Sequence, residues 1–389
     1  MMLTRDEVSN RFEDLYKARP KVIARAPARA NIIGEHTDYN GGFVLPFAID
    51  RTTYAAAQRR DDQTVQVYSE NMKEMDSFTL DSVEKTADRP WANYLRGLFW
   101  VLQQGDYWLK GVDLYIHGDV PLAAGLASSA SMEVAALIAI SYAIELSPVR
   151  TELVVMARRA ETDFVGVPCG IMDQYTAVFA KAGQAILLDC QTLHYEHVPV
   201  DLGDAVFFIV DSGIRRKLEA SDYSARQMEC ENAMQAMRPF YPGILSLRDV
   251  SMEQYERVRG KIPPNLEKRA RHVIYENKRV NQMAAALKSK DAEGAGLLLT
   301  ASHKSLSDLF EVSSSEIDLL VGMLIGIPGV LGARLMGAGF GGSILGLARN
   351  PDYGAIKRHL ADKYTAVTGF ATEVFPVHPS VGATLEKFL

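Results

Sequence analysis

Residues 25–42 read RAPARANIIGEHTDYNGG and bring four chemically active side chains close together in the chain. Arg29, Glu35, His36 and Asp38 fall within ten positions, among residues that favour turns. This composition predicts a loop between strands rather than a helix. The carboxylates can accept hydrogen bonds from hydroxyl groups, the imidazole can donate or accept, and the guanidinium can only donate. Such a loop suits a small polyhydroxylated ligand, although a solvated connector can have the same composition.

The chain has 389 residues, which is longer than one compact core usually supports. We therefore expect two domains, over residues 1–200 and 201–389. Hydrophobic residues make up 48% of the chain and charged residues 23%, as in ordinary globular proteins. The formal net charge of −6, without a long run of Lys or Arg, argues against a nucleic-acid partner.

The N-terminal segment is charged almost from its start and lacks the apolar stretch of a signal peptide. No uninterrupted apolar run approaches the length of a membrane span, so we expect no membrane partner. Cys169, Cys190 and Cys230 are widely spaced and match no zinc-binding pattern. These features predict a cytoplasmic protein with reduced thiols.

Hydrophobic periodicity predicts mixed helices and strands, with the second half richer in helix. Helices are expected over 5–18, 91–102, 132–144, 151–164, 221–237, 252–257, 266–287, 292–309, 315–323 and 353–368. Strands are expected over 22–26, 43–48, 53–58, 64–69, 111–117, 185–189, 206–211, 330–335, 343–348 and 373–377.

A second loop, residues 118–131, is rich in Gly, Ala and Ser and lies between a predicted strand and a long apolar helix. That order points a helix N-terminus at the loop, where free backbone N–H groups and the helix dipole favour an anion. Small residues also let phosphate oxygens approach the backbone. The alternative is an ordinary turn capped by serine. Capping needs one serine, however, and this loop has Ser128, Ser129 and Ser131.

Residues 337–342 match the G-x-G-x-x-G pattern of dinucleotide-binding proteins, but their context differs. That pattern requires a helix after the glycines, whereas residues 343–348 are predicted to form a strand. We therefore expect a glycine-rich hairpin. Gly260 and Lys261 lack the upstream glycine of a P-loop, and the protein-kinase signatures are missing.

Two further carboxylates, Glu161 and Asp173, follow the second loop. Phosphoryl transfer needs positioned phosphates, a metal ion on oxygen ligands, a cation for the developing charge and sometimes a base. The two loops and these carboxylates supply all of these parts.

Together these segments resemble the motifs of the GHMP small-molecule kinases, and residues 29–40 resemble the galactokinase signature within that superfamily. Residues 91–94, 170–174 and 221–223 also fall where galactokinases have comparable residues, so the resemblance spans nearly the whole chain. It implies a two-domain α/β (α+β) fold, with an N-terminal ribosomal-S5-like domain, a C-terminal ferredoxin-like domain and the active site in the cleft between them. It also implies ATP-dependent phosphorylation of galactose at the anomeric hydroxyl. Several family members are monomers.

The resemblance assigns a role to each candidate site residue. The sugar pocket would be formed by Glu35, His36, Thr37, Asp38, Gly170 and Tyr223. Asp173 would act on the anomeric hydroxyl, either as the base or by orienting it, and Arg29 would stabilise the transferring phosphoryl group. Ser129 and Glu161 would bind Mg²⁺, which prefers oxygen ligands. Ser69 and Trp91 would lie near the base and ribose of ATP, and its phosphates would be wrapped by Ala123, Ala124, Gly125, Leu126, Ala127, Ser128 and Ser129.

Five positions depart from the usual galactokinase pattern: Ala28, Ala123, Ala127, Met336 and Ala338. Met336 replaces a threonine near the expected phosphate and sugar region, which leaves open a 1-kinase for another sugar, such as an amino sugar or a pentose. A catalytically silent sugar sensor is a further alternative. Residues 128–131 and the other catalytic-type residues are intact, which favours an active kinase.

Overall fold

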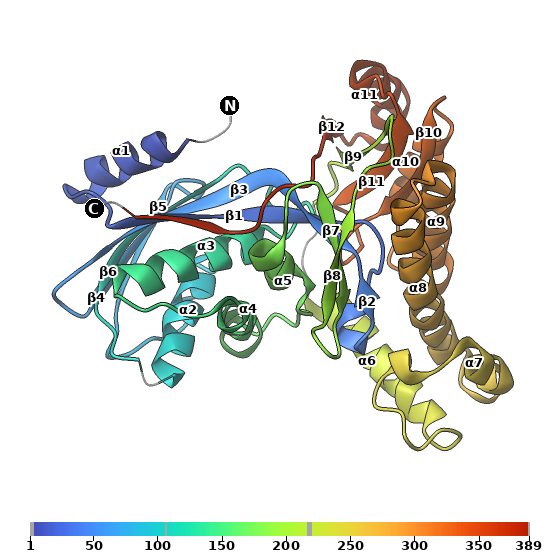
Figure 1. The fold of residues 1–389 in the computed structure, drawn as a ribbon, viewed down its shortest axis with the longest axis horizontal. Coiled ribbons are helices and arrows are strands. Elements are labelled where there is room, and N and C mark those ends of the chain that lie inside the picture. Colours follow the sequence, from blue (N-terminus) through green and yellow to red (C-terminus); the bar gives the residue numbers. More distant parts are fainter. Residues whose placement is uncertain (1–3, 106, 216–219, 388–389) are drawn as a thin grey trace.

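The structure, a computed structural model, describes residues 4–105, 107–215 and 220–387. Within these residues the chain forms three sheets, and helices cover them (Figure 1). The largest sheet organises the N-terminal half, and a smaller sheet organises the C-terminal half. No helix in the described part of the chain is long and apolar enough to cross a membrane.

The N-terminal sheet is antiparallel except where β6 and β4 run parallel. Its two faces follow from the alternation of side chains along each strand. In β1, Ala24 packs against the helices beneath the sheet, whereas Ile23 packs against Phe12 on the opposite face. The order of strands is β13 (Thr384–Lys387), β1 (Val22–Asn31), β3 (Pro46–Arg59), β6 (Val112–Gly118), β4 (Thr64–Ser69) and β5 (Glu74–Thr79).

Four helices cover one face of this sheet, and α1 (Arg5–Tyr16) covers the other (Figure 1). The central helix, α3, is apolar nearly all round and is correspondingly buried on most sides. A π-helical turn, Ala160–Val165, follows α4 and carries Glu161. The four helices are α2 (Ala92–Gln104), α3 (Ser128–Ala143), α4 (Arg150–Arg159) and α5 (Met172–Phe179).

The C-terminal half is built on an antiparallel sheet and a group of longer helices. The sheet order is β10 (Val330–Leu335), β11 (Ser343–Arg349), β9 (Ala205–Asp211) and β12 (Glu373–Pro376). A small sheet joins β2 (Phe43–Val44), β7 (Gln184–Asp189) and β8 (Tyr195–Pro199). The helices are α6 (Ala220–Met237), α7 (Met252–Val258), α8 (Pro264–Lys288), α9 (Ala292–Ser305), α10 (Ser315–Ile325), α11 (Tyr353–Leu360) and α12 (Ala366–Thr368).

One hydrophobic core is shared by both halves. Ile32 and Phe47, from the N-terminal half, pack in the same cluster as Ile209, Leu345 and Met283 from the C-terminal half. All five side chains are fully buried. The segment between β1 and β3 therefore lies against the C-terminal sheet and α8, which is the arrangement that brings distant motifs to one site.

Most of the predicted elements are present, but the loop predicted over residues 25–42 is wrong in its first part. β1 continues to Asn31, so Arg29 stands on a strand and the loop begins only after it. The strand accommodates Pro27 because its pairing with β3 shifts register between Pro27 and Arg29. The strands expected over 43–48 and 53–58 form instead the short β2 and the long β3, and β5, β8, β13 and α5 were not predicted.

Candidate active site

A cavity of about 320 Å³ lies where the two halves meet. The N-terminal half supplies most of its wall, and the C-terminal half closes it with residues from α6 and the β10–β11 turn. The lining residues are Arg29, Glu35, His36, Asp38, Tyr94, Ala123, Gly125, Leu126, Ala127, Ser128, Ser129, Glu161, Val167, Pro168, Cys169, Gly170, Met172, Asp173, Tyr223, Gly337 and Ala338.

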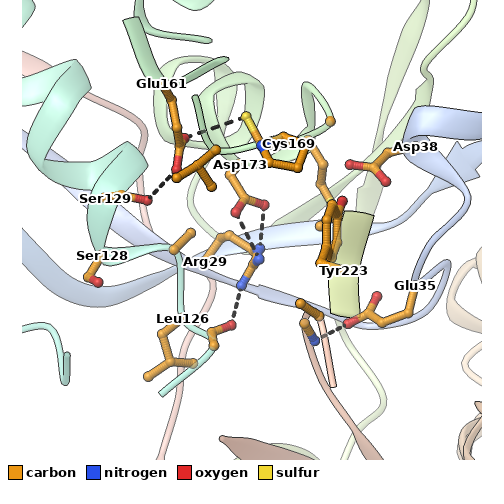
Figure 2. A pocket seen from close by; sticks show the side chains of 18 of the residues that line it. Arg29, Glu35, Asp38, Leu126, Ser128, Ser129, Glu161, Cys169, Asp173 and Tyr223 are labelled. Atoms are coloured by element: carbon orange, nitrogen blue, oxygen red, sulfur yellow. Dashed lines mark hydrogen bonds and ion pairs between the residues drawn. The ribbon is translucent and has the colours of Figure 1, made fainter. Parts of the chain in front are cut away.

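Arg29 and Asp173 form a two-point ion pair within this cavity (Figure 2). Arg29 Nε donates to Asp173 Oδ1 at 2.9 Å, and Nη2 donates to Oδ2 at 3.0 Å. Arg29 Nη1 also donates to the carbonyl oxygen of Gly125 at 2.5 Å. Asp173 lies in the first turn of α5, where the helix dipole favours a carboxylate. One guanidinium therefore links the carboxylate of Asp173 to the loop that precedes α3.

Glu35 lies on one side of this pair and is held by groups from both halves (Figure 2). Its Oε1 accepts a hydrogen bond from the backbone N–H of Gly337 at 2.6 Å and pairs with Arg334 Nη2 at 3.0 Å. The side-chain amide of Asn31 donates to its Oε2. A carboxylate has about four acceptor positions, so Glu35 keeps capacity for a ligand hydroxyl in a fixed orientation.

Asp38 lies near Glu35 and depends on Gly170 for its place. A Cβ atom on Gly170 would overlap the carboxylate of Asp38, so glycine is required at this position. Desolvation and the neighbouring charge of Asp173 raise the pKa of Asp38 to about 6. Asp38 therefore becomes ionised close to neutral pH and can then accept hydrogen bonds from hydroxyl groups.

His36 adopts a left-handed backbone conformation, with φ of +62°, which is uncommon for a residue other than glycine. Its Nδ1 lies 2.9 Å from the hydroxyl oxygen of Tyr39. The imidazole ring lies 5.6 Å from the ring of Tyr223 and 4.5 Å from the ring of Phe310, between centroids. Strained backbone of this kind is concentrated at functional sites.

The loop before α3 turns its backbone toward the cavity through three residues with positive φ: Ala123 at +56°, Gly125 at +77° and Ala127 at +59°. Ala127 precedes α3 and provides no side-chain cap. The first N–H groups of a helix lack partners within it, and those of α3 start at the lining residues Ser128 and Ser129. This arrangement is suited to phosphate oxygens.

Ser129 and Glu161 lie together on the side of the cavity opposite Glu35 and Asp38 (Figure 2). Ser129 Oγ donates to Glu161 Oε1 at 3.2 Å. Burial and the charge of Asp173 raise the pKa of Glu161 to about 7. A hydroxyl and a carboxylate oxygen at this spacing form a suitable pair of ligands for a hard divalent cation.

Two buried polar residues behind Glu161 were not assigned from the sequence. Gln174 Nε2 donates to Glu161 Oε2 at 2.8 Å and lies 3.3 Å from Oε2 of the fully buried Glu133. Burial and the neighbouring carboxylate of Glu161 raise the pKa of Glu133 well above its ordinary value. Glu133 follows Ser129 by four positions on α3, and this spacing, which places both on one helix face, was the available signal.

Four of the predicted site residues do not line this cavity. Thr37 Oγ1 lies 2.7 Å from the carbonyl oxygens of both Gly34 and Phe43, so its side chain stabilises the loop between β1 and β2. Ala124 is buried in the core. Ser69 Oγ accepts from the backbone N–H of Met72, and Trp91 Nε1 donates to Glu74. The nucleotide-binding roles of Ser69 and Trp91 therefore stay predictions.

The five positions that depart from the usual galactokinase pattern fall into two groups. Ala123, Ala127 and Ala338 line the cavity, whereas Ala28 and Met336 are fully buried in the core shared by the two halves. The Met336 side chain therefore lies among apolar residues and not in the wall of the site.

Three family profiles match separate parts of the chain. The galactokinase galactose-binding signature matches residues 10–59, the GHMP kinase N-terminal domain matches 93–181 and the GHMP kinase C-terminal domain matches 283–366. A galactokinase of Roseiflexus sp. strain RS-1 is 43% identical and is aligned over 98% of this chain and 97% of its own length. The chain belongs to the galactokinase family.

Other galactokinases agree with this assignment. That of Thermotoga maritima is 42% identical over 87% of this chain and 93% of its own length. The crystal structure of Lactococcus lactis galactokinase complexed with galactose is 36% identical and superposes with a TM-score of 0.93, covering 97% of this chain and 99% of that chain. Mevalonate kinase of Methanococcus jannaschii shares the fold, with 18% identity, a TM-score of 0.66 and coverage of 92% and 98%. The predicted GHMP fold and sugar-kinase class are confirmed, and membership of this family makes ATP the co-substrate.

Proposed function

We propose that this protein transfers the γ-phosphoryl group of ATP to the anomeric hydroxyl of galactose, giving α-D-galactose 1-phosphate and ADP. The observation that carries the proposal is the position of the Arg29–Asp173 pair. It lies between the hydroxyl-accepting side chains Glu35 and Asp38 and the Ser129–Glu161 pair at the start of α3 (Figure 2).

The sugar would occupy the part of the cavity beside Glu35, His36, Asp38 and Tyr223. Its anomeric hydroxyl would face Asp173, whose carboxylate can accept the proton as the oxygen attacks phosphorus. The new O–P bond forms while the bond to the bridging oxygen of ADP breaks. Arg29, fixed between Asp173 and Gly125, would stabilise the charge on the transferring group without having to move.

The phosphates would lie against the N-terminus of α3 and the loop 123–129, which offers small side chains and backbone N–H groups. Ser129 and Glu161 would hold Mg²⁺, which supplies charge neutralisation at the phosphate oxygens. This part of the proposal is supported by the two oxygen ligands that Ser129 and Glu161 offer, since Mg²⁺ prefers oxygen ligands.

The division into domains at about residue 200 is also a proposal, supported by the start of the four-stranded C-terminal sheet at β9; β13 returns from the second half to the edge of the N-terminal sheet. A monomeric state is likewise a proposal, and it rests on the resemblance to a family with several monomeric members.

A panel of sugars tests the proposed function. Purified protein with ATP and Mg²⁺ should phosphorylate galactose in preference to galactosamine, arabinose and glucose, with the phosphate on C1. Preferred turnover of another sugar would contradict the proposed specificity for galactose. Binding of sugar and ATP without turnover of any sugar would identify a sensor instead of an enzyme.

A further inference from the structure

The loop that carries the proposed sugar ligands is held by side chains that do not themselves line the cavity. Three of them lie on one face of α8, and each contacts a backbone group of the loop. Glu276 Oε1 accepts from the N–H of Gly34 at 3.1 Å, His272 Nε2 lies 3.1 Å from the carbonyl oxygen of Glu35, and Asn277 Oδ1 accepts from the N–H of Phe43 at 2.8 Å.

His272 is the member of this set with the closest connection to the cavity. Its ring lies 4.5 Å from that of Phe310, between centroids, and the ring of Phe310 also lies 4.5 Å from the ring of His36. His272 therefore contacts the backbone of Glu35 directly and supports the ring of His36 through Phe310. Glu35 and His36 both line the cavity.

The protonation of His272 follows from its partners. The ring is fully buried, and burial lowers its pKa to about 4, so the imidazole is neutral at pH 7. A carbonyl oxygen can only accept, so Nε2 must carry the proton that is shared with Glu35. Nδ1 then accepts from the hydroxyl of Ser305, which lies 2.8 Å away. One tautomer satisfies both contacts: the Glu35 carbonyl oxygen selects it, and the hydroxyl of Ser305, which can donate or accept, then donates to Nδ1.

We propose that His272 is a positioning residue for the sugar: its Nε2–H fixes the backbone at Glu35, and its ring supports His36 through Phe310, so that the C-terminal half sets sugar affinity from outside the pocket. This inference deepens the proposed function and rests on it. Because His272 contacts neither the phosphate loop nor the Ser129–Glu161 pair, its loss should weaken sugar binding and leave nucleotide binding unchanged.

The test compares His272→Leu with His272→Gln in the full-length protein. Leucine removes the donor, whereas the glutamine amide can still donate to the Glu35 carbonyl oxygen. Calorimetry should show galactose binding weakened about tenfold in His272→Leu and within about threefold of wild type in His272→Gln, because an unsatisfied buried acceptor is costly. Affinity for a non-hydrolysable ATP analogue should change less than twofold in both variants.

Two further variants separate this role from general destabilisation. Leu324→Ala opens the core of the C-terminal sheet in a separate cluster, so it should lower the melting temperature without changing galactose affinity. Ser305→Ala removes only the hydroxyl that donates to His272 Nδ1, which leaves the ring less firmly held, and should weaken galactose binding about threefold. It provides the test if His272→Leu does not fold.

Three results would overturn the inference: equal galactose affinity in wild type and in His272→Leu or Ser305→Ala, parallel losses for sugar and nucleotide, or an equal loss of sugar affinity in Leu324→Ala. Wild-type protein that does not bind galactose at all would instead overturn the proposed function.

Discussion

Arg29 and Asp173 lie 144 positions apart in the chain, yet their side chains meet through two parallel hydrogen bonds. The guanidinium side chain is almost completely buried, with 6% exposed, whereas 29% of the Asp173 side chain is exposed. The buried partner is therefore fixed by the fold, and the more exposed carboxylate faces the cavity. This asymmetry is what a fixed cation and a reacting carboxylate require.

Arg29→Ala should lower kcat by about two to three orders of magnitude, because loss of one preorganised donor typically has that effect. Arg29→Lys should not restore the rate, since an ammonium group cannot make the two-point contact with Asp173 and also reach Gly125. The measurement is steady-state turnover at saturating galactose and ATP. A lysine variant with near-normal kcat would show that positive charge alone is sufficient.

Gly170→Ala should raise the KM for galactose by tenfold or more, because the added methyl group overlaps the carboxylate of Asp38 and displaces it. The KM for ATP should change little. Gly243→Ala is the matched control, since no heavy atom beyond its chain neighbours lies within 4 Å of the position of its added Cβ. Unchanged galactose KM in Gly170→Ala would remove Asp38 from the sugar pocket.

Ala123→Gly should stabilise the protein by up to about 1 kcal/mol, because Ala123 has a φ of +56° that glycine adopts without steric cost. Ala124→Gly, at the adjacent buried position with ordinary φ, should be destabilising. Chemical denaturation measures the free energy of unfolding of both variants and of the wild type. A loss of stability in Ala123→Gly equal to that in Ala124→Gly would contradict the assigned backbone strain.

The raised pKa of Asp38 predicts that the difference in stability between Asp38→Asn and the wild type depends on pH. Its folded pKa of about 6 exceeds the ordinary value of 3.8, so the folded protein binds the proton more tightly than the unfolded chain does. The stabilising contribution of the protonated carboxyl is therefore present below about pH 4 and is lost as the pH rises toward and through 6. Without sugar, Asp38→Asn should resemble wild type in stability at pH 4 and exceed it by about 2 kcal/mol at pH 7.5.

Urea denaturation at the two pH values measures this difference. Asp61→Asn, at an exposed position, is the control and should show no comparable change. A stability difference between Asp38→Asn and wild type that does not increase with pH would contradict the ionisation assigned to Asp38.

The sequence predicted the fold class, but it did not predict several details of the fold around the candidate site. The candidate residues that the galactokinase resemblance grouped into one site do line one cavity, and they include Arg29, Glu35, Asp38, Ser129, Glu161 and Asp173. β13 was missed because its four residues carry little pattern, and its place beside β1 depends on chain segments more than 350 positions apart. No local signal separated the end of β1 from the loop, since the bulge at Pro27 depends on the register with β3.

The residues of α8 that contact the loop after β1 were not predicted, because their role also depends on contacts between distant segments. His272 and Glu276 fit the pattern of α8 as ordinary helical positions, and their contacts with Gly34 and Glu35 exist only after α8 packs on the loop. The same packing places Met336 in the core. From the sequence alone, the side chain of Met336 was expected near the phosphate and sugar region.

The turnover of Asp173→Asn tests the central claim most directly, because asparagine preserves the shape of the side chain and removes the proton-accepting charge. At saturating galactose, ATP and Mg²⁺ we expect kcat to fall by at least about two orders of magnitude, with galactose affinity retained. A variant that phosphorylates galactose at close to the wild-type rate would contradict the assignment of Asp173 and Arg29 as the reaction centre.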